Sequence, residues 1–320
     1  MAALLACSGT IPVGRPKIAR LPTHEARRER PAQPATGERA LGGIHLHLRV
    51  RRHMTDERAT TMAARQSLRV AFVGKGGAGK SAIAGTFARA LARQGQSVLA
   101  IDSDPMPGLA YSLGLAITEA PPIPDDAVVE REEGESGPRF RLRPGLGGGE
   151  AVERYAVTAP DGVRFLQFGK LRGNVAPLMR AQFAFRQIVA DLPEDRWSLV
   201  GDLPGGTRQA FTGWGAYART FLVVVEPTAK SLLSARRLAR LASADEGVHK
   251  VAAVANRVRV PGDAEIVHAR TGLEVVGAVP WDEAFAEAER RGKAPIDDAP
   301  DCPAVRAVEA LVARLVEESV

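Results

Sequence analysis

The sequence predicts an α/β fold in which helices flank a doubly wound, mostly parallel β-sheet. From Ser67 onward, short apolar runs alternate with amphipathic stretches, a pattern typical of βα units around a parallel sheet. Residues 197–200 and 221–225 are nearly unbroken apolar runs, as expected for parallel strands that are covered on both faces. A glycine-rich loop also separates the first apolar run from the first amphipathic stretch.

Each predicted strand is a short apolar run next to polar or turn-forming residues. Residues 68–73 precede the glycine-rich loop, and residues 97–101 end at a pair of aspartates. The later strands are predicted over residues 162–168, 197–200, 221–225, 251–255 and 274–279.

The predicted helices alternate with these strands and then close the chain. They cover residues 80–93, 177–191 and 231–242, a short stretch near residue 264, and residues 283–291 and 304–317. In the first helix, Ile83, Phe87 and Leu91 share one face because they recur at i, i+4 and i+8. The last helix has the same kind of apolar face, formed by Val305, Val308, Leu311, Val312 and Leu315. Both helices are therefore expected to pack on the sheet.

Residues 67–320 are predicted to form one domain, since about 250 residues can bury a single large core. Residues 119–161 interrupt its alternating pattern with three prolines, an acidic run and a glycine-rich run, at Pro121, Pro122, Pro124, 130–135 and 145–149. Long irregular segments of this kind are lids, small hairpin insertions or disordered chain. We predict a partly ordered, irregular insertion.

The excess positive charge belongs to the N-terminal segment. Residues 1–66 carry 12 of the 43 Lys and Arg residues and 5 of the 37 Asp and Glu residues, so the other 254 residues have 31 bases, 32 acids and a net charge of −1. The segment is rich in Arg, Pro and Gly and lacks sustained periodicity. We predict a disordered basic tail or upstream sequence before a misassigned start, with Met54 and Met62 as alternatives to Met1.

The remaining composition favours a cytoplasmic protein. Cys7 and Cys302 cannot form a disulfide framework, which indicates a reducing compartment. No window approaches the roughly 18 uninterrupted apolar residues of a membrane-spanning helix. Residues 4–7 imitate a lipoprotein cleavage site, but no basic residue precedes them and the apolar run is too short for a signal peptide.

The glycine-rich loop matches the phosphate-loop pattern G-x-x-x-x-G-K-[ST]. Its predicted nucleotide-binding residues are Gly74, Lys75, Gly76, Gly77, Ala78, Gly79, Lys80 and Ser81. In this pattern the backbone N–H groups surround a phosphate, the lysine at position 80 reaches the β- and γ-phosphates, and the hydroxyl of Ser81 serves Mg²⁺. A strand before the loop and a helix after it supply the required context, which predicts a P-loop NTPase fold.

An acidic residue follows another predicted strand. Asp202 leaves the apolar run 197–200 and is followed by Gly205 and Gly206. A carboxylate at this position can hold Mg²⁺ through water, and two glycines let the backbone follow the γ-phosphate as it appears and disappears. Asp202 is therefore a predicted catalytic residue and metal ligand.

The loop, with lysines at 75 and 80, resembles the K-G-G-x-G-K-S signature of the deviant-Walker (SIMIBI) P-loop ATPases of the MinD/ParA group. The resemblance covers residues 68–295. It implies an ATPase that hydrolyses the β–γ phosphoanhydride bond with ATP and Mg²⁺ as cofactors. It also implies a homodimer in the ATP state, in which the lysine at the position of Lys75 contacts the partner's ATP.

The resemblance implies roles for five more predicted site residues. In the D-x-D-P sequence after the second strand, Asp104 would orient or deprotonate the attacking water and Asp102 would support the metal shell. Asn256 and Arg257 are similar to the pair that reads adenine in the family, and Pro280 belongs to a V-P-x-D loop that lies beside the base.

Among the branches, the chain most resembles the carbon monoxide dehydrogenase nickel-insertion (CooC-type) accessory ATPases. The shared features are the run 221–228 with Lys230-Ser231, the Asn256-Arg257 pair, and residues 276–282. One departure is important. Residues 173–177 read G-N-V-A-P where that branch has a metal-binding C-x-C pair, and thiolates are the ligands that would select nickel or zinc.

The predicted function is therefore an accessory or maturation ATPase that acts on a partner protein or metalloenzyme. The alternative is a spatial-organisation ATPase of the MinD/ParA type. The net charge of −1 outside the tail argues against DNA as a partner, although Arg236, Arg237 and Arg240 leave room for a small basic patch. The last helix ends in Glu317-Glu318 rather than in a basic amphipathic tip, which argues against a membrane. The sequence does not identify the client protein.

Overall fold

The computed structural model describes residues 67–104, 108–116, 123–132, 134, 136, 139–168, 175–206, 213–242 and 250–319. All of them belong to one compact unit, Asp56–Val320. The predicted tail and the three candidate start methionines lie outside the described residues.

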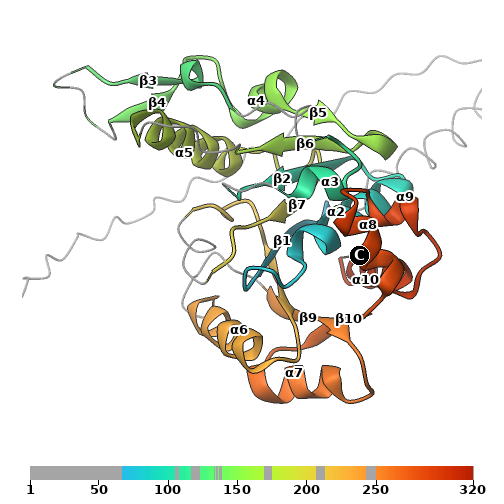
Figure 1. The fold of residues 1–320 in the computed structure, drawn as a ribbon. Coiled ribbons are helices and arrows are strands. Elements are labelled where there is room, and N and C mark those ends of the chain that lie inside the picture. The colour runs from blue at the N-terminus through green and yellow to red at the C-terminus, as the bar shows by residue number, and fades with distance from the viewer. Residues whose placement is uncertain are drawn as a thin grey trace, which may run out of the picture. The chain divides into compact units, whose positions relative to one another are not determined.

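Eight of the described strands form a central sheet in the order β10-β9-β8-β1-β7-β2-β6-β5 (Figure 1). In this sheet, every pairing is parallel except that between β5 and β6. The bounds are β1 Arg69–Gly74, β2 Val98–Asp102, β5 Val157–Thr158, β6 Arg164–Gln167, β7 Ser198–Asp202, β8 Thr220–Val225, β9 Lys250–Val258 and β10 Val275–Pro280. The predicted parallel sheet is confirmed, and β1 lies at its centre.

The helices form two layers, one on each face of the sheet. The bounds are α2 Lys80–Arg93, α3 Leu109–Ser112, α4 Gly148–Tyr155, α5 Val175–Ala190, α6 Ala229–Ala242, α7 Asp263–Thr271, α8 Glu283–Arg290, α9 Pro295–Asp298 and α10 Pro303–Glu317. On β1, Val70 and Phe72 face the layer that contains α2 and α10, while Ala71 and Val73 face the layer that contains α5 and α6. This alternation follows from the two-residue period of a strand.

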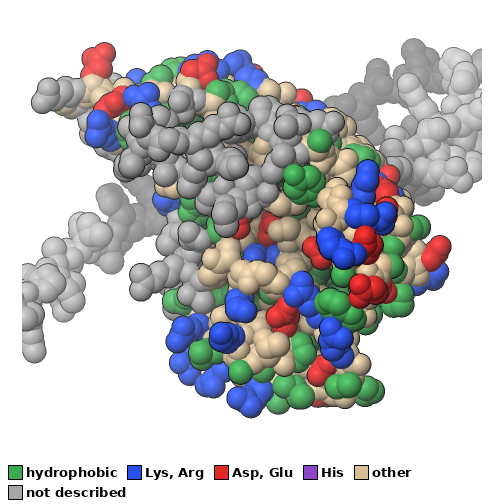
Figure 2. Space-filling view, viewed as in Figure 1, with side chains coloured by type: hydrophobic (Ala, Val, Ile, Leu, Met, Phe, Trp, Pro, Cys, Tyr) green, Lys and Arg blue, Asp and Glu red, His purple; other side chains and the backbone are tan. Residues whose placement is uncertain are grey.

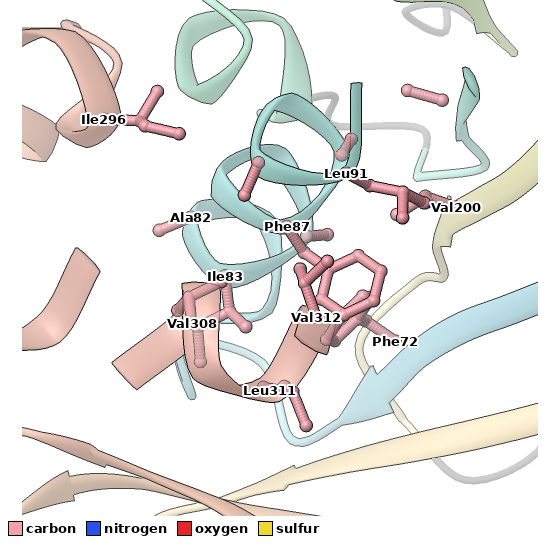
Figure 3. Close-up of a cluster of buried hydrophobic side chains, with 14 of the residues drawn as sticks. Phe72, Ala82, Ile83, Phe87, Leu91, Val200, Ile296, Val308, Leu311 and Val312 are labelled. Atoms are coloured by element: carbon pink, nitrogen blue, oxygen red, sulfur yellow. The ribbon is translucent and has the colours of Figure 1, made fainter. Parts of the chain in front are cut away.

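The first and last helices pack on each other as their apolar faces predict. Figure 3 shows Ile83 and Phe87 of α2 beside Val308 and Val312 of α10, and Leu91 of α2 beside Val200 of β7. Each of these side chains is completely buried. The ring of Phe87 also contacts that of Phe72 on β1, with centroids 5.5 Å apart. This packing holds α2, and therefore the loop before it, against the central strand.

The segment predicted as an irregular insertion contains regular elements. Its described residues form the 3₁₀ turns η1 Asp125–Ala127 and η2 Pro160–Gly162, the antiparallel hairpin β3 Val128–Glu130 and β4 Phe140–Leu142, the helix α4 and the strand β5. The glycine-rich sequence at the start of α4 is typical of a loop. However, the backbone N–H of Gly148 donates to Asp191 Oδ2 at 2.7 Å, so the cap of α4 comes from a residue 43 positions away.

No helix among the described residues is long and apolar enough to cross a membrane.

Candidate functional site

The loop of residues 74–79 joins β1 to α2 at the carboxyl end of the central strand. Gly77 and Gly79 have φ angles of 79° and 89°, a left-handed conformation that favours glycine. A Cβ atom on Gly74 would lie 2.6 Å from the carbonyl oxygen of Val224 on β8. The spacing of these glycines is therefore required by the path of the loop.

The start of α2 is suited to an anion. No side chain caps this 14-residue helix within the described part of the chain, and its first turn has no acidic residue. The first backbone N–H groups and the positive end of the helix dipole therefore face the loop without an anion from the chain itself. A phosphate group is the ligand that this arrangement favours.

Lys80, Ser81 and Asp202 come together where α2 begins and β7 ends. The Ser81 hydroxyl donates a hydrogen bond to Asp202 Oδ2, whereas Asp202 Oδ1 is buried and has no hydrogen-bond partner among the described residues. Burial raises the pKa of Asp202 to about 6, although the Lys80 ammonium and the Ser81 hydroxyl oppose the shift. A hydroxyl beside an unsatisfied carboxylate oxygen is a donor set that fits Mg²⁺.

Asp102 lies beside Asp202, because the two are register partners on the neighbouring strands β2 and β7. Asp102 is fully buried, and its Oδ1 and Oδ2 accept backbone N–H groups of Asp104 and Leu109 at 2.9 and 3.1 Å. Burial and the charge of Asp202 raise the pKa of Asp102, while the two N–H groups act in the opposite direction. The Asp102 side chain thus fastens the segment that carries Asp104 to the sheet.

Lys75 and Asp104 lie at the same edge of the sheet. Both side chains are half-buried. The charge of Asp104 contributes to the raised pKa of Asp202, so these two carboxylates are close to each other. The ammonium of Lys75 makes no ion pair with a described residue, which leaves its charge available to a ligand.

The segment after β7 packs against the phosphate loop. The backbone N–H of Gly206 donates to the carbonyl oxygen of Gly74 at 3.2 Å. A Cβ atom on Gly205 would lie 2.9 Å from Gly76 Cα and 3.7 Å from Lys80 Nζ. A change in the position of this segment would therefore alter its direct contacts with the phosphate loop.

Asn256 and Arg257, at the end of β9, also contact the loop. The Asn256 side-chain amide donates to the carbonyl oxygen of Ala78 at 2.7 Å, so one of its two N–H bonds is already used. Arg257 has a φ angle of 56°, which is rare for a residue other than glycine. Its guanidinium donates to the carbonyl oxygen of Gly77 at 3.3 Å and pairs with Glu226.

A cavity of about 150 Å³ lies beside the end of the loop. The predicted residues Asn256, Arg257 and Pro280 all line it, together with Gly79 and Trp281. Trp281 is 37% exposed, and the guanidinium of Arg259 lies over its indole ring, 4.4 Å from the ring centroid. The three residues predicted from the resemblance are therefore brought to one cavity next to the phosphate loop.

Two contributors to this site, Glu226 and Tyr217, are not among the residues predicted from the sequence. Glu226 pairs with Arg257, and no local pattern joins residues 31 positions apart. Tyr217 is 2% exposed and its hydroxyl lies against Gly201, directly before Asp202. The glycine that precedes Asp202 in an otherwise apolar strand was the available signal, because a strand glycine marks the close approach of another group.

Gly201→Ala is expected to destabilise the chain strongly. The new Cβ atom would lie 1.5 Å from the Tyr217 hydroxyl oxygen and 2.6 Å from its Cζ, in a site that is already filled. Overpacking of this kind costs about 1–3 kcal/mol of unfolding free energy, or more. The double variant Gly201→Ala/Tyr217→Phe should recover part of the lost stability. It removes the contact with the hydroxyl oxygen but keeps the contact with the ring.

The measurement is the urea midpoint of each variant. Gly149→Ala is the matched control, because a Cβ atom there would have no neighbour closer than 3.7 Å. Equal midpoints for Gly201→Ala and the parent chain would contradict the contact between Gly201 and Tyr217.

Comparison with known proteins identifies the family. The model of the CobQ/CobB/MinD/ParA nucleotide binding domain matches residues 70–296. The carbon monoxide dehydrogenase accessory protein CooC of Rhodospirillum rubrum is 30% identical over 265 residues, which are 78% of this chain and 97% of that protein. An ATP-binding protein of Methanocaldococcus jannaschii is 28% identical over 235 residues, 71% of this chain and 90% of that protein.

A solved structure supports the fold. The septum site-determining protein MinD of Pyrococcus horikoshii, solved in complex with Mg-ADP, superposes with a TM-score of 0.60 at 17% identity and covers 77% of this chain and 94% of its own. Together with the family match, this confirms the predicted P-loop NTPase fold. The chain belongs to the CobQ/CobB/MinD/ParA nucleotide-binding family and is a P-loop ATPase.

Proposed function

We propose that the chain is a Mg²⁺-dependent accessory ATPase that dimerises around ATP and acts on a partner protein or metalloenzyme. The observation that carries the catalytic part is the cluster of Lys80, Ser81 and Asp202 beside the phosphate loop, in which Lys80 and Asp202 are buried and Ser81 is half-buried. The relative that is named as a carbon monoxide dehydrogenase accessory protein favours the accessory role over spatial organisation.

The proposed reaction transfers the γ-phosphoryl group of ATP to water. The bond between the γ-phosphorus and the bridging oxygen breaks, and ADP and inorganic phosphate leave. Lys80 would neutralise charge on the β- and γ-phosphates, and Asp104 would orient the attacking water. Ser81 and Asp202 would hold Mg²⁺, which would neutralise phosphate charge when bound. Asp102 supports this arrangement by fixing the Asp104 segment.

The remaining predicted residues would bind the rest of the nucleotide. The loop residues 74–79 would surround the phosphates through their backbone N–H groups. Asn256, Arg257 and Pro280 would lie beside the adenine, since all three line the cavity at the end of the loop.

Transport or insertion of a metal is not part of this proposal. Residues 173–177, which the resemblance places at the position of the C-x-C pair of the nickel-insertion branch, contain no cysteine. Residues 173 and 174 lie outside the described part of the chain. Among the described residues, no group of three or more His, Cys, Asp or Glu side chains is placed to hold a metal ion.

Lys75→Ala is expected to weaken ATP-driven dimerisation while the monomer still folds. In the proposed dimer this ammonium contacts the phosphates of the opposite subunit, and no described residue of its own chain pairs with it. Sedimentation velocity of the full chain with a non-hydrolysable ATP analogue measures the effect. Lys293→Ala, which removes an exposed lysine that is not part of the loop, is the control. A dimer that forms equally well in Lys75→Ala would refute the proposed contact.

A further inference from the structure

Helix α6 presents an exposed basic face to solvent. The helix has four basic residues and no acidic residue, and Figure 2 shows basic side chains gathered over it. At 100° per residue, its exposed side chains fall on one side of the helix: Lys230, Leu233, Arg236, Arg237, Arg240 and Leu241. The face is therefore a continuous strip of cations with two leucines among them.

The four cations of α6 are not neutralised within the described part of the chain. None of them forms an ion pair with a described residue. Arginines on other helices behave differently: Arg154 pairs with Glu150 on α4, and Arg314 pairs with Glu318 at the end of α10. Like charges gathered on one helix face repel one another. An anionic partner would remove this repulsion.

The leucines of the face are not needed by the core. Leu233 and Leu241 are 50% and 40% exposed, whereas Leu232, Ala235 and Leu238 already bury the opposite side of α6 against the sheet. Two exposed leucines eight positions apart are separated by about 12 Å along the helix. This spacing matches two turns of a second helix laid along the first, whose own apolar residues recur at i and i+7 or i+8.

We propose that this face of α6 docks an acidic amphipathic helix of a partner protein. The inference deepens the proposed function, on which it rests for the existence of a partner. A nucleic acid would use the cations but gains nothing from exposed leucines. A membrane would need a broad apolar face, and the broad apolar face of α6 is buried in the core. An acidic helix that also carries leucines would pair its carboxylates with the cations of α6 and pack its leucines against the exposed leucines of α6.

The position of α6 places such a partner near the nucleotide site. The backbone N–H of Glu226 donates to the hydroxyl of Ser231 in the first turn of α6 at 3.0 Å. The Glu226 carboxylate pairs with Arg257, and Arg257 donates to the carbonyl oxygen of Gly77 in the phosphate loop. Only three residues therefore separate the docking face from the phosphate loop.

The test uses the full chain without nucleotide and a fluorescent 20-residue helical peptide with Leu at i and i+7 flanked by Glu. Fluorescence anisotropy at low ionic strength should show saturable binding. The triple variant Lys230→Ala/Arg236→Ala/Arg240→Ala should bind at least about tenfold more weakly, and Leu233→Ser should weaken binding several-fold. Arg154→Ala, at an exposed arginine on another helix, should bind as the parent does.

Several results would overturn the proposal. They are no binding of the peptide, binding that the triple variant leaves unchanged, and tighter α6-dependent binding of a 20-base-pair DNA duplex or of vesicles of anionic phospholipid. Self-association of the chain that the triple variant abolishes would also overturn it, because the occupant would then be a second copy. Since no nucleotide is present, failure of the chain to hydrolyse ATP would refute the proposed function and leave this result intact.

Discussion

Lys80→Ala is expected to lower the rate of ATP hydrolysis at saturating ATP by about 100- to 1,000-fold, which is typical for the loss of one preorganised group that stabilises the transition state. The Lys80 side chain is 7% exposed, and its charge is close enough to Asp202 to oppose the rise of that residue's pKa. A cation held in a poorly solvated site interacts more strongly with a phosphoryl group than one in water does.

The experiment compares phosphate release by the parent chain, Lys80→Ala and Lys80→Gln. The glutamine variant fills the site without the charge, so a loss that both variants share belongs to the charge and not to the packing. Lys293→Ala serves as the control for removal of an exposed lysine. Hydrolysis by Lys80→Ala and Lys80→Gln at the parental rate would refute the proposed role of Lys80 in catalysis.

The parts of the site that lie close together in sequence could be predicted from the sequence. The residues of the phosphate loop, from Gly74 to Ser81, belong to one strand–loop–helix unit. Their spacing in the sequence therefore determines their relative positions. Asp102 and Asp202, which were both expected to serve the metal, also lie together, because they are register partners at the carboxyl ends of neighbouring parallel strands.

The contacts that depend on tertiary packing could not be predicted. The helix α4 is capped by Asp191, and Arg257 is held by Glu226, so neither contact leaves a pattern in a short window of sequence. The same holds for Gly201, whose lack of a side chain is explained by the hydroxyl and ring of Tyr217. A single sequence shows the spacing of such residues but not their partners.

Asp202→Asn is expected to stabilise the ligand-free chain at neutral pH and to lower its rate of hydrolysis by about 100-fold or more. Burial holds the pKa of Asp202 at about 6 in the folded chain, whereas an unfolded chain has an aspartate pKa near 3.9. At a pH between these two pKa values, the folded chain binds the proton more tightly than the unfolded chain does. The free energy of unfolding therefore falls as the pH rises through this range.

Above pH 6 the folded chain bears the full free-energy cost of burying the charged Asp202 carboxylate. This cost is about 3 kcal/mol for a pKa shift of about two units. The asparagine variant has no such charge to bury. It also removes the charge that raises the pKa of the neighbouring Asp102. Urea unfolding from pH 4 to pH 8 should therefore show a variant that is more stable than the parent at pH 8, with the difference shrinking toward pH 4. Asp301→Asn, at a carboxylate that is 88% exposed, should show no such trend.

Asp202→Asn is expected to raise the stability and to lower the rate of hydrolysis, and both effects arise from the loss of the buried charge. A carboxylate with one unsatisfied oxygen in a buried site costs folding free energy, and the same oxygen is what a cation would bind. A variant that is less stable than the parent at pH 8 would show that Lys80 and Ser81 already compensate the charge without a ligand. A variant that retains hydrolysis would show that Asp202 is structural only.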